Sequence, residues 1–282
     1  MLMLSKKQVE QILNDIQKNK KYSSISRDLI KKEIKKYFQI SPKSISLLEK
    51  TQSKKYKEII KKIRNRLHLV YGSFQTKSKA KMEGLLREID GINDYKTHDK
   101  ILSLSVSSKE RLKDYEKIYS SIFKITTRPK KIIDLGCGLN PISYPYMHIN
   151  NLVYYAYDID QKDIAFLDNY FNIIGRYTKI KGKAFVADLK DLDIVKELPR
   201  ADICFMFKLV DVLERRGHKL SEELIKSLKC KHIVVSFPTK TVSGRNMRHP
   251  YRGWIEKMLD RIGYKFERIV FDNEVFYIIS KS

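Results

Sequence analysis

Ile132-Ile-Asp134-Leu-Gly136-Cys-Gly138-Leu-Asn140-Pro141 is the stretch of this sequence that decides the fold. A short apolar run ends in an acid and continues into an Asp-x-Gly-x-Gly turn. This pattern predicts a buried strand and a turn whose backbone passes close to a ligand. A dinucleotide-binding turn would carry a third glycine, as Gly-x-Gly-x-x-Gly, and would aim a helix N-terminus at a pyrophosphate. That glycine is missing here, and Asp134 suits a cationic group such as the amino group of methionine. The stretch favours S-adenosylmethionine over a dinucleotide, and the alternative is a plain strand-to-helix turn.

Two further apolar runs also end in acids. Asp158 follows Val153–Tyr157, and Asp188 and Leu189 follow Phe185-Val-Ala. An acid at the end of the second strand, about 20 residues past the turn, is placed to accept the ribose hydroxyls of a nucleoside cofactor. Asp188 can accept the adenine amino group, with Leu189 or Ile159 against the ring. These patterns predict cofactor contacts at Asp134, Gly136, Gly138, Asp158, Ile159, Asp188 and Leu189.

Strands and helices alternate from about residue 130 onward. The expected strands are 131–134, 152–157, 183–186, 203–207 and 232–236, and the expected helices are 161–174, 221–228 and 253–262. Two β-rich runs at 265–271 and 275–279 read as an antiparallel hairpin. Alternating units of this kind predict a mostly parallel, Rossmann-like α/β sheet. The closing hairpin fits a class I S-adenosylmethionine-dependent methyltransferase better than a dehydrogenase.

The first third of the chain is Lys-rich and is predicted to be all-helical. Val9, Ile12, Leu13 and Ile16 form one apolar helix face. Further helices are expected at 26–37, 44–71, 77–89 and, from the capping-box spacing of Ser107 and Glu110, at 107–123. Residues 1–100 hold 25 Lys and Arg against 11 Asp and Glu, a net +14 out of +24 for the chain. We predict a helical docking domain over 1–104 and a catalytic domain over 105–282.

Composition excludes several classes of protein. An apolar share of 42% argues against a disordered chain, and no apolar run is long enough for a membrane span. Cys137, Cys204 and Cys230 lack metal-ligand spacing, and their odd number argues against a disulfide framework. We expect a cytoplasmic protein with no metal and no membrane partner. The charge of +24 points to nucleic acid, and the alternative is a Lys-rich bias that serves only solubility.

The stretch after the fourth strand limits the methyl acceptor. Ile203–Phe207 is followed by Lys208, with no Asn/Asp-Pro-Pro-aromatic motif for an exocyclic amine and no Pro-Cys for cytosine C5 attack. Lys208 and Asp211 form only part of the Lys-Asp-Lys-Glu set for ribose 2′-O transfer. Guanine N7 has an in-plane lone pair and loses no proton, so it needs positioning and no general base. The lack of an obvious acid or base fits such a target.

Several motifs together resemble the Arm-type aminoglycoside-resistance 16S ribosomal RNA (guanine-N7) methyltransferases, which act on the decoding-site guanine 1405. The matching pieces run in order along nearly the whole chain: Lys20-Lys-Tyr22, Leu67-His68, Tyr71-Gly-Ser73, Ser108–Leu112, Asp134–Pro141, Asp158–Asp160, Met206–Leu209, Leu213-Glu214, Val235–Lys240, Gly244-Arg245 and Asn273-Glu274. The combination of Gly-Leu-Asn-Pro with Ser-Phe-Pro-Thr-Lys carries most of the specificity.

The resemblance implies roles for particular residues and a partner. Arg111 would bind the methionine carboxylate of S-adenosylmethionine, and the helical domain would dock on 16S ribosomal RNA in the 30S subunit. The target nucleotide, with its base flipped out, would be met by Lys208, Phe237, Lys240, Arg245 and Trp254. We expect a monomer. The stretch from Gly244 to Trp254 is shorter than the family pattern and contains Pro250. A methyltransferase with a housekeeping role at a different rRNA site, including a ribose 2′-O, therefore stays as an alternative. A non-catalytic rRNA-binding factor and a small-molecule methyltransferase are the other two alternatives.

Overall fold

The computed structural model describes residues 4–19, 22–23, 25–71, 79–214, 217–241, 245–247 and 250–281, with only the backbone of 68–71 and 79–81. The chain divides into two compact units. The smaller unit is Met1–Gln75 with Ile159–Lys162, and the larger is Thr76–Asp158 with Asp163–Ser282. Among the described residues, no helix combines the length and hydropathy that crossing a bilayer requires.

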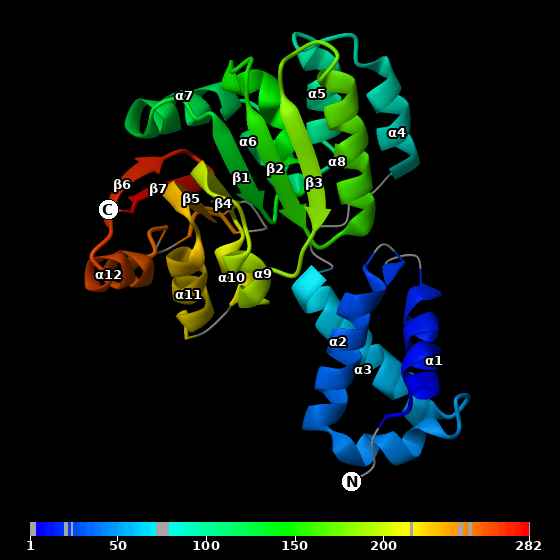
Figure 1. Cartoon of the computed structure of the whole chain (residues 1–282). Helices are drawn as coiled ribbons and strands as arrows, with labels where there is room; N and C mark the ends of the chain where they lie inside the picture. The colour runs from blue at the N-terminus through cyan, green and yellow to red at the C-terminus, as the bar shows by residue number, and fades with distance from the viewer. Residues whose placement is uncertain are drawn as a thin grey trace. The chain divides into compact units, whose positions relative to one another are not determined.

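Helices build the smaller unit, as the sequence predicts (Figure 1, blue to cyan). They are α1 (Lys6–Gln17), α2 (Arg27–Ile40), the 3-10 helix η2 (Pro42–Leu48) and α3 (Lys54–Tyr71). A capping box starts α1, because the Ser5 hydroxyl accepts the Gln8 N–H at 3.2 Å and the Gln8 side chain accepts the Ser5 N–H at 2.9 Å. The buried face of α1 is the predicted one, and it packs with residues of α2 and α3 in one apolar core.

The helix expected over 44–71 begins ten residues later, at Lys54. Pro42 starts a 3-10 helix that ends at Leu48, and a new cap follows at Ser53. The Ser53 hydroxyl accepts the Tyr56 N–H at 3.1 Å. A serine that caps a helix competes with the continuation of the preceding one, and this cap sets where α3 starts.

Seven strands form one sheet in the larger unit, in the order β3-β2-β1-β4-β5-β7-β6. Their bounds are β1 (Lys131–Leu135), β2 (Val153–Asp158), β3 (Lys181–Val186), β4 (Ala201–Phe207), β5 (Cys230–Pro238), β6 (Lys265–Val270) and β7 (Glu274–Ser280). The first five strands are parallel to one another, and β7 is antiparallel to both β5 and β6. The predicted mostly parallel sheet with a closing hairpin is confirmed.

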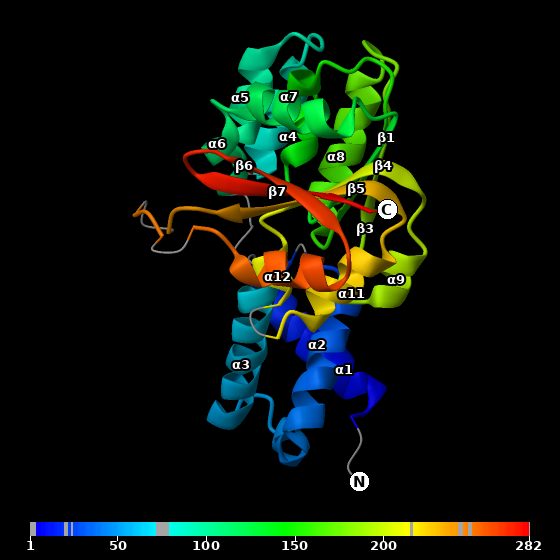
Figure 2. The same ribbon diagram turned by 90° about the vertical axis from the view of Figure 1, so that its left-hand side faces the viewer.

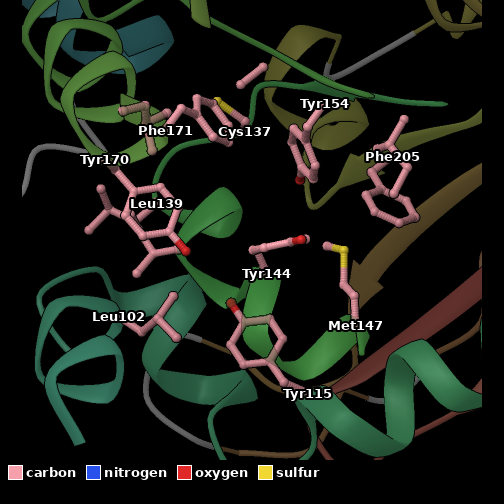
Figure 3. Packing of buried hydrophobic residues seen from close by; sticks show 14 of the residues in the cluster. Leu102, Tyr115, Cys137, Leu139, Tyr144, Met147, Tyr154, Tyr170, Phe171 and Phe205 are labelled. Carbon is pink, nitrogen blue, oxygen red and sulfur yellow. The ribbon is translucent and has the colours of Figure 1, made fainter. Parts of the chain in front are cut away.

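Helices cover both faces of this sheet (Figure 2). They are α4 (Lys79–Glu88), α5 (Tyr95–Leu102), α6 (Val106–Arg111), α7 (Tyr115–Thr126), the 3-10 helix η4 (Asn140–Met147), α8 (Gln161–Ile174), α9 (Leu192–Lys196), α10 (Val210–Leu213), α11 (Lys219–Ser227) and α12 (Gly253–Arg261). Alternate strand residues face opposite layers: Ile132 packs with α4, α5, α7, η4 and α8, and Ile133 packs with α9 to α12. Figure 3 shows the first of these layers, which is rich in tyrosine.

One further predicted helix and the division of the chain also differ from what we expected. The single helix expected over 107–123 is split into α6 and α7, and Ser105 rather than Ser107 precedes α6. The split lets Arg111, the last residue of α6, turn into the core, where it has a buried acidic partner. The compact units divide after Gln75, whereas we expected a division after residue 104, because Leu85, Ile101 and other apolar residues of α4 and α5 join the core of the larger unit.

Candidate active site

The carboxyl ends of the parallel strands bring most of the predicted site residues to one edge of the sheet. β1 pairs with β2 on one side and β4 on the other, β3 lies beyond β2, and β5 lies beyond β4. Along this edge the order is therefore Asp188, Asp158, the turn after β1, Lys208 and Ser236, in the positions where open α/β sheets bind ligands.

Two glycines give the turn after β1 its shape. Gly136 and Gly138 both have positive φ, at 62° and 49°. A Cβ on Gly136 would lie 2.5 Å from Cδ1 of Leu209, but one on Gly138 would meet nothing within 4 Å. The N–H groups of Gly136 and Cys137 donate to the Tyr157 carbonyl at 2.8 and 3.1 Å. The turn is thus fixed against β2 and has open space beside Gly138, which fits the close approach of a nucleoside cofactor.

Asp134, at the end of β1, holds the residues of the following turn through buried hydrogen bonds. It is 1% exposed, and its Oδ2 accepts hydrogen bonds from Tyr154 Oη at 2.7 Å and Asn140 Nδ2 at 2.9 Å. Burial raises the pKa of Asp134 to about 7, although both hydrogen bonds oppose the shift. Tyr154 belongs to the aromatic layer of Figure 3. The contact between Asp134 and the methionine amino group stays a prediction.

The ends of β2 and β3 are joined to each other and to the turn. Asp158 Oδ2 accepts the Gly138 N–H at 2.8 Å, and the Asp158 carbonyl accepts the Ala187 N–H at 2.8 Å. Asp188 is half-buried, and its Oδ1 accepts the Lys190 N–H at 3.1 Å. Leu189 is buried in the layer beneath. Ile159 groups with the smaller unit and packs on that unit's core, and its contact with the adenine ring stays a prediction.

Arg111 is paired inside the protein with an acid that sequence reasoning missed. It is 4% exposed, and its Nε and Nη2 donate to Oε2 and Oε1 of Glu274, both at 2.8 Å. Burial lowers the pKa of Arg111, but the Glu274 carboxylate outweighs burial and raises it overall. The Ser236 hydroxyl also donates to Glu274. The sequence shows this acid in the Asn273-Glu274 motif, directly before the apolar run Val275–Ile279. An acid beside such a run can be buried, and a buried carboxylate needs partners.

Lys208 adds a second cation to this cluster. Its Nζ lies 3.4 Å from Glu274 Oε2 and also pairs with Glu110. Lys208 has a positive φ of 53°, and its N–H donates to both the carbonyl and the hydroxyl of Ser236, at 3.1 and 2.9 Å. A left-handed non-glycine residue costs of order 1–3 kcal/mol and clusters at functional sites. This backbone geometry, held by β5, lets the Lys208 side chain reach Glu274.

The predicted target-facing residues separate into three groups. Phe237, which we expected to meet the target nucleotide, is fully buried among β-sheet and α12 side chains, so its ring is not exposed at the surface. Trp254 is half-buried and stacks on His218, with ring centroids 3.8 Å apart. Lys240 pairs with Asp272 at 2.7 Å, and Arg245 is exposed. Other predicted motif residues, among them Lys20, Gly72 and Gly244, lie outside the described residues.

Arg252 is a further residue that the sequence did not single out. Its guanidinium carbon lies 5.3 Å from the centre of the Phe237 ring, and Nη2 lies 3.4 Å from Asp211 Oδ2. The cation therefore joins the start of α12 to α10 above a buried aromatic ring. No local pattern marked this residue, because its partners come from three separate segments.

The sequence of the chain is similar to those of known proteins over most of its length. Residues 33–278 match the model of the family described as ribosomal RNA methyltransferase (FmrO). Two relatives are each named 16S rRNA (guanine(1405)-N(7))-methyltransferase. The relative from Micromonospora echinospora is 30% identical, over 79% of this chain and 83% of its own length. The relative from Proteus mirabilis is 26% identical, over 87% of this chain and 93% of its own length.

Solved structures agree with the sheet topology. The 16S rRNA methyltransferase RmtF, in complex with S-adenosyl-L-homocysteine, matches with a TM-score of 0.78 and 22% identity over 99% of this chain and all of that chain. The 16S rRNA methylase ArmA matches with a TM-score of 0.54 and 28% identity, over 71% of this chain and 98% of its own. The predicted class I methyltransferase fold is confirmed by these likenesses.

Proposed function

Because the chain belongs to the FmrO family of ribosomal RNA methyltransferases, we propose that it methylates N7 of guanine 1405 in 16S ribosomal RNA. The observation that carries the proposal is the extent of the family match, which includes the entire strand edge. Relatives named for this reaction align over most of both chains. In this proposal the methyl group makes the decoding region resistant to aminoglycosides.

Residues at the strand edge would hold S-adenosylmethionine, which supplies an electrophilic methyl group when bound. Asp158 would receive the ribose, and Asp188 the adenine amino group. Arg111 would meet the methionine carboxylate through Nη1, because Glu274 already occupies Nε and Nη2. The open space beside Gly138 supports this placement. These residues would orient the cofactor so that its methyl group faces the target.

The proposed reaction requires guanine N7 to be aligned with the methyl group, and it requires no proton acceptor. Guanine N7 attacks with an in-plane lone pair and no proton leaves the base. A well-aligned pair of reactants can supply roughly 7–11 kcal/mol of barrier lowering. Trp254, Lys240 and Arg245 would face the extruded nucleotide. Lys208 is paired with Glu110 and Glu274, and it would hold α6 and β7 in place beside the site.

The smaller unit would dock the enzyme on the 30S subunit. It carries 20 Lys and Arg against 7 Asp and Glu, a net +13. Charge of this density suits RNA phosphates, whose neutralisation releases counterions. We propose that the protein works as a monomer in the cytoplasm, on the assembled subunit.

Methylation of purified 30S subunits tests the proposal. Subunits are incubated with enzyme and S-adenosylmethionine, and the modified nucleotide is located by mass spectrometry and by primer extension after cleavage at N7-methylguanine. We expect one methyl group on the base of guanine 1405. A methyl group on a ribose would show the 2′-O alternative. No heat on titration with S-adenosylhomocysteine, together with no methyl transfer, would leave a non-catalytic rRNA-binding factor.

A further inference from the structure

A strongly basic hollow lies at the opposite end of the sheet from the active site. Its volume is about 730 Å³. It lies at the amino ends of β1, β2, β4 and β5, so it faces away from the edge that carries Asp158 and Asp188 (Figure 1, at the tails of the strand arrows). Seven of its lining residues are cationic and one is acidic: Lys130, Lys131, Arg200, Asp202, Lys226, Lys229, Lys231 and Lys281. We call these eight residues the amino-edge patch.

The patch holds more than half of the charge excess of the larger unit. That unit has 37 Lys and Arg against 26 Asp and Glu, a net +11. The patch contributes +6, and the rest of the unit is nearly balanced, with 30 Lys and Arg against 25 Asp and Glu. A general lysine bias would spread the excess over the surface. Its concentration at one hollow indicates an anionic partner.

The single carboxylate of the patch is already used by the fold. Asp202 Oδ2 accepts the N–H groups of Lys130 and Lys131 at 2.9 and 3.0 Å, and its Oδ1 lies 3.3 Å from Lys231 Nζ. Burial raises the pKa of Asp202, but these hydrogen bonds outweigh it and the net shift is downward. Asp202 thus holds the start of β1 against β4.

One cation of the patch is likewise structural. Lys281 Nζ donates to three carbonyls at the end of α11, those of Ile225 at 3.1 Å, Lys226 at 2.9 Å and Leu228 at 2.6 Å. In contrast, Lys130, Arg200 and Lys229 are exposed, and none of them makes an ion pair within the described part of the chain. These three side chains are available to a partner.

The spacing of these cations favours an extended polyanion. They come from the starts of β1, β4 and β5, which are neighbouring strands about 4.8 Å apart. The side chains therefore span roughly 10 Å, more than one phosphate group covers. The lysine ammonium groups act as point charges, and a row of such cations suits the phosphates of a sugar–phosphate backbone. We propose that the amino-edge patch binds the phosphate backbone of a 16S ribosomal RNA segment other than the one that carries the target.

This inference rests on the proposed function for the identity of the RNA, and its test separates the two. Binding is measured over a series of salt concentrations for the wild type and for Lys130→Gln/Lys229→Gln, on 30S subunits and on protein-free 16S ribosomal RNA. We expect the double variant to bind both about tenfold more weakly near 0.1 M salt. The slope of log K against log salt should fall by about 1.5, from two lost phosphate contacts.

Lys117→Gln/Lys124→Gln on α7 is the matched control, because both lysines are exposed and the charge change is the same. It should leave affinity and slope within twofold of the wild type, and S-adenosylhomocysteine affinity should report an intact fold in both variants. Equal losses in the two variants would overturn the proposal. A loss on 30S subunits but not on protein-free RNA would indicate a ribosomal protein and also overturn it. Failure of the proposed function would appear separately, as RNA binding by the wild type without methyl transfer.

Discussion

At the scale of single residues, the site depends on charges that are held inside the protein. Glu274 receives Arg111 in a two-point pair, and Lys208 lies beside them. Asp134 is buried with two neutral donors. A buried ion pair adds little net stability, but removal of one partner leaves a costly unpaired charge. The sequence could mark Arg111 and Asp134 but not the Arg111–Glu274 pair, because its members are 163 residues apart.

Glu274→Gln should be strongly destabilising. The substitution leaves the Arg111 guanidinium buried without a carboxylate, and the loss of one partner of a buried pair costs about 3–5 kcal/mol. Urea unfolding followed by circular dichroism measures the change. Glu116→Gln is the control, since Glu116 pairs with His148 at the surface and should cost under about 0.5 kcal/mol. Equal midpoints for the two variants would contradict the role of the buried pair.

Asp134 should make stability fall with rising pH. Its folded pKa is raised from 3.8 to about 7, so the folded state keeps a proton that the unfolded state releases. The contribution is fully present below pH 4 and is lost as the pH rises to about 7. In Asp134→Asn the side-chain oxygen can still accept both hydrogen bonds, but the side chain does not titrate, so the loss of stability with rising pH should disappear. Between pH 4 and 7 the melting temperature of the variant, relative to that of the wild type, should rise, and above pH 7 the difference should stay constant up to pH 8. A constant difference would show that Asp134 does not titrate in this range.

At the scale of elements, the sequence predicted what periodicity and turn chemistry determine. All seven strands were anticipated to within two residues at each end, and α8 matched at both ends. The errors occur where tertiary contacts override a local signal. Ser107 and Glu110 have capping-box spacing, yet α6 begins one residue before Ser107 and ends at Arg111, whose side chain enters the core. Phe237 resembles an exposed recognition residue in sequence and is buried because β5 is an inner strand.

The two glycines of the β1 turn should respond differently to alanine. Gly136→Ala meets Leu209 and a positive φ, so it should destabilise the fold by more than the roughly 1–2 kcal/mol that the backbone alone costs. Gly138→Ala should lose only the stability that a positive φ costs an alanine, because nothing lies within 4 Å of the added methyl group. That methyl group would, however, occupy the open space beside residue 138, where we expect the cofactor. Thermal unfolding should rank Gly136→Ala as the less stable variant. Calorimetry should show at least tenfold weaker S-adenosylhomocysteine binding for Gly138→Ala.

Gly263→Ala provides the control for this pair. Gly263 has a φ of 76° and open surroundings, and it lies after α12, away from the turn. Its backbone cost should be similar, and cofactor affinity should be unchanged. If Gly138→Ala bound S-adenosylhomocysteine as well as Gly263→Ala does, the cofactor would not pass beside Gly138.

At the scale of the whole molecule, charge and catalysis are carried by different parts. The smaller unit has a net +13, and the strand edge with its acids belongs to the larger unit. The sequence predicted the concentration of charge in the first third but not the division after Gln75. That division follows from the packing of α4 and α5 side chains on the sheet layer, which no local pattern reveals.

Charge reversal on α2 should weaken 30S binding without any effect on cofactor binding. Lys32 and Lys35 are exposed on this helix, and Lys32→Glu/Lys35→Glu should lower affinity more at low salt than at high salt. Filter binding at two salt concentrations measures the effect. Lys117→Glu/Lys124→Glu gives the protein the same net charge and should have a much smaller effect. A loss of affinity that is equal at the two salt concentrations, or no larger than that of the α7 variant, would contradict a docking role for this helix.

The position of β7 has a consequence for how the protein is made. β7 follows every other strand along the chain, yet it lies between β5 and β6, and it carries Glu274. During synthesis, Arg111 leaves the ribosome 163 residues before its partner. Contacts between residues so distant in sequence form late in folding. The nascent chain therefore holds an unneutralised cation and an open sheet until the hairpin arrives. The Arg111–Glu274 pair beside the site forms only after β7 has been translated. The enzyme therefore cannot modify ribosomal RNA while its catalytic domain is still being made.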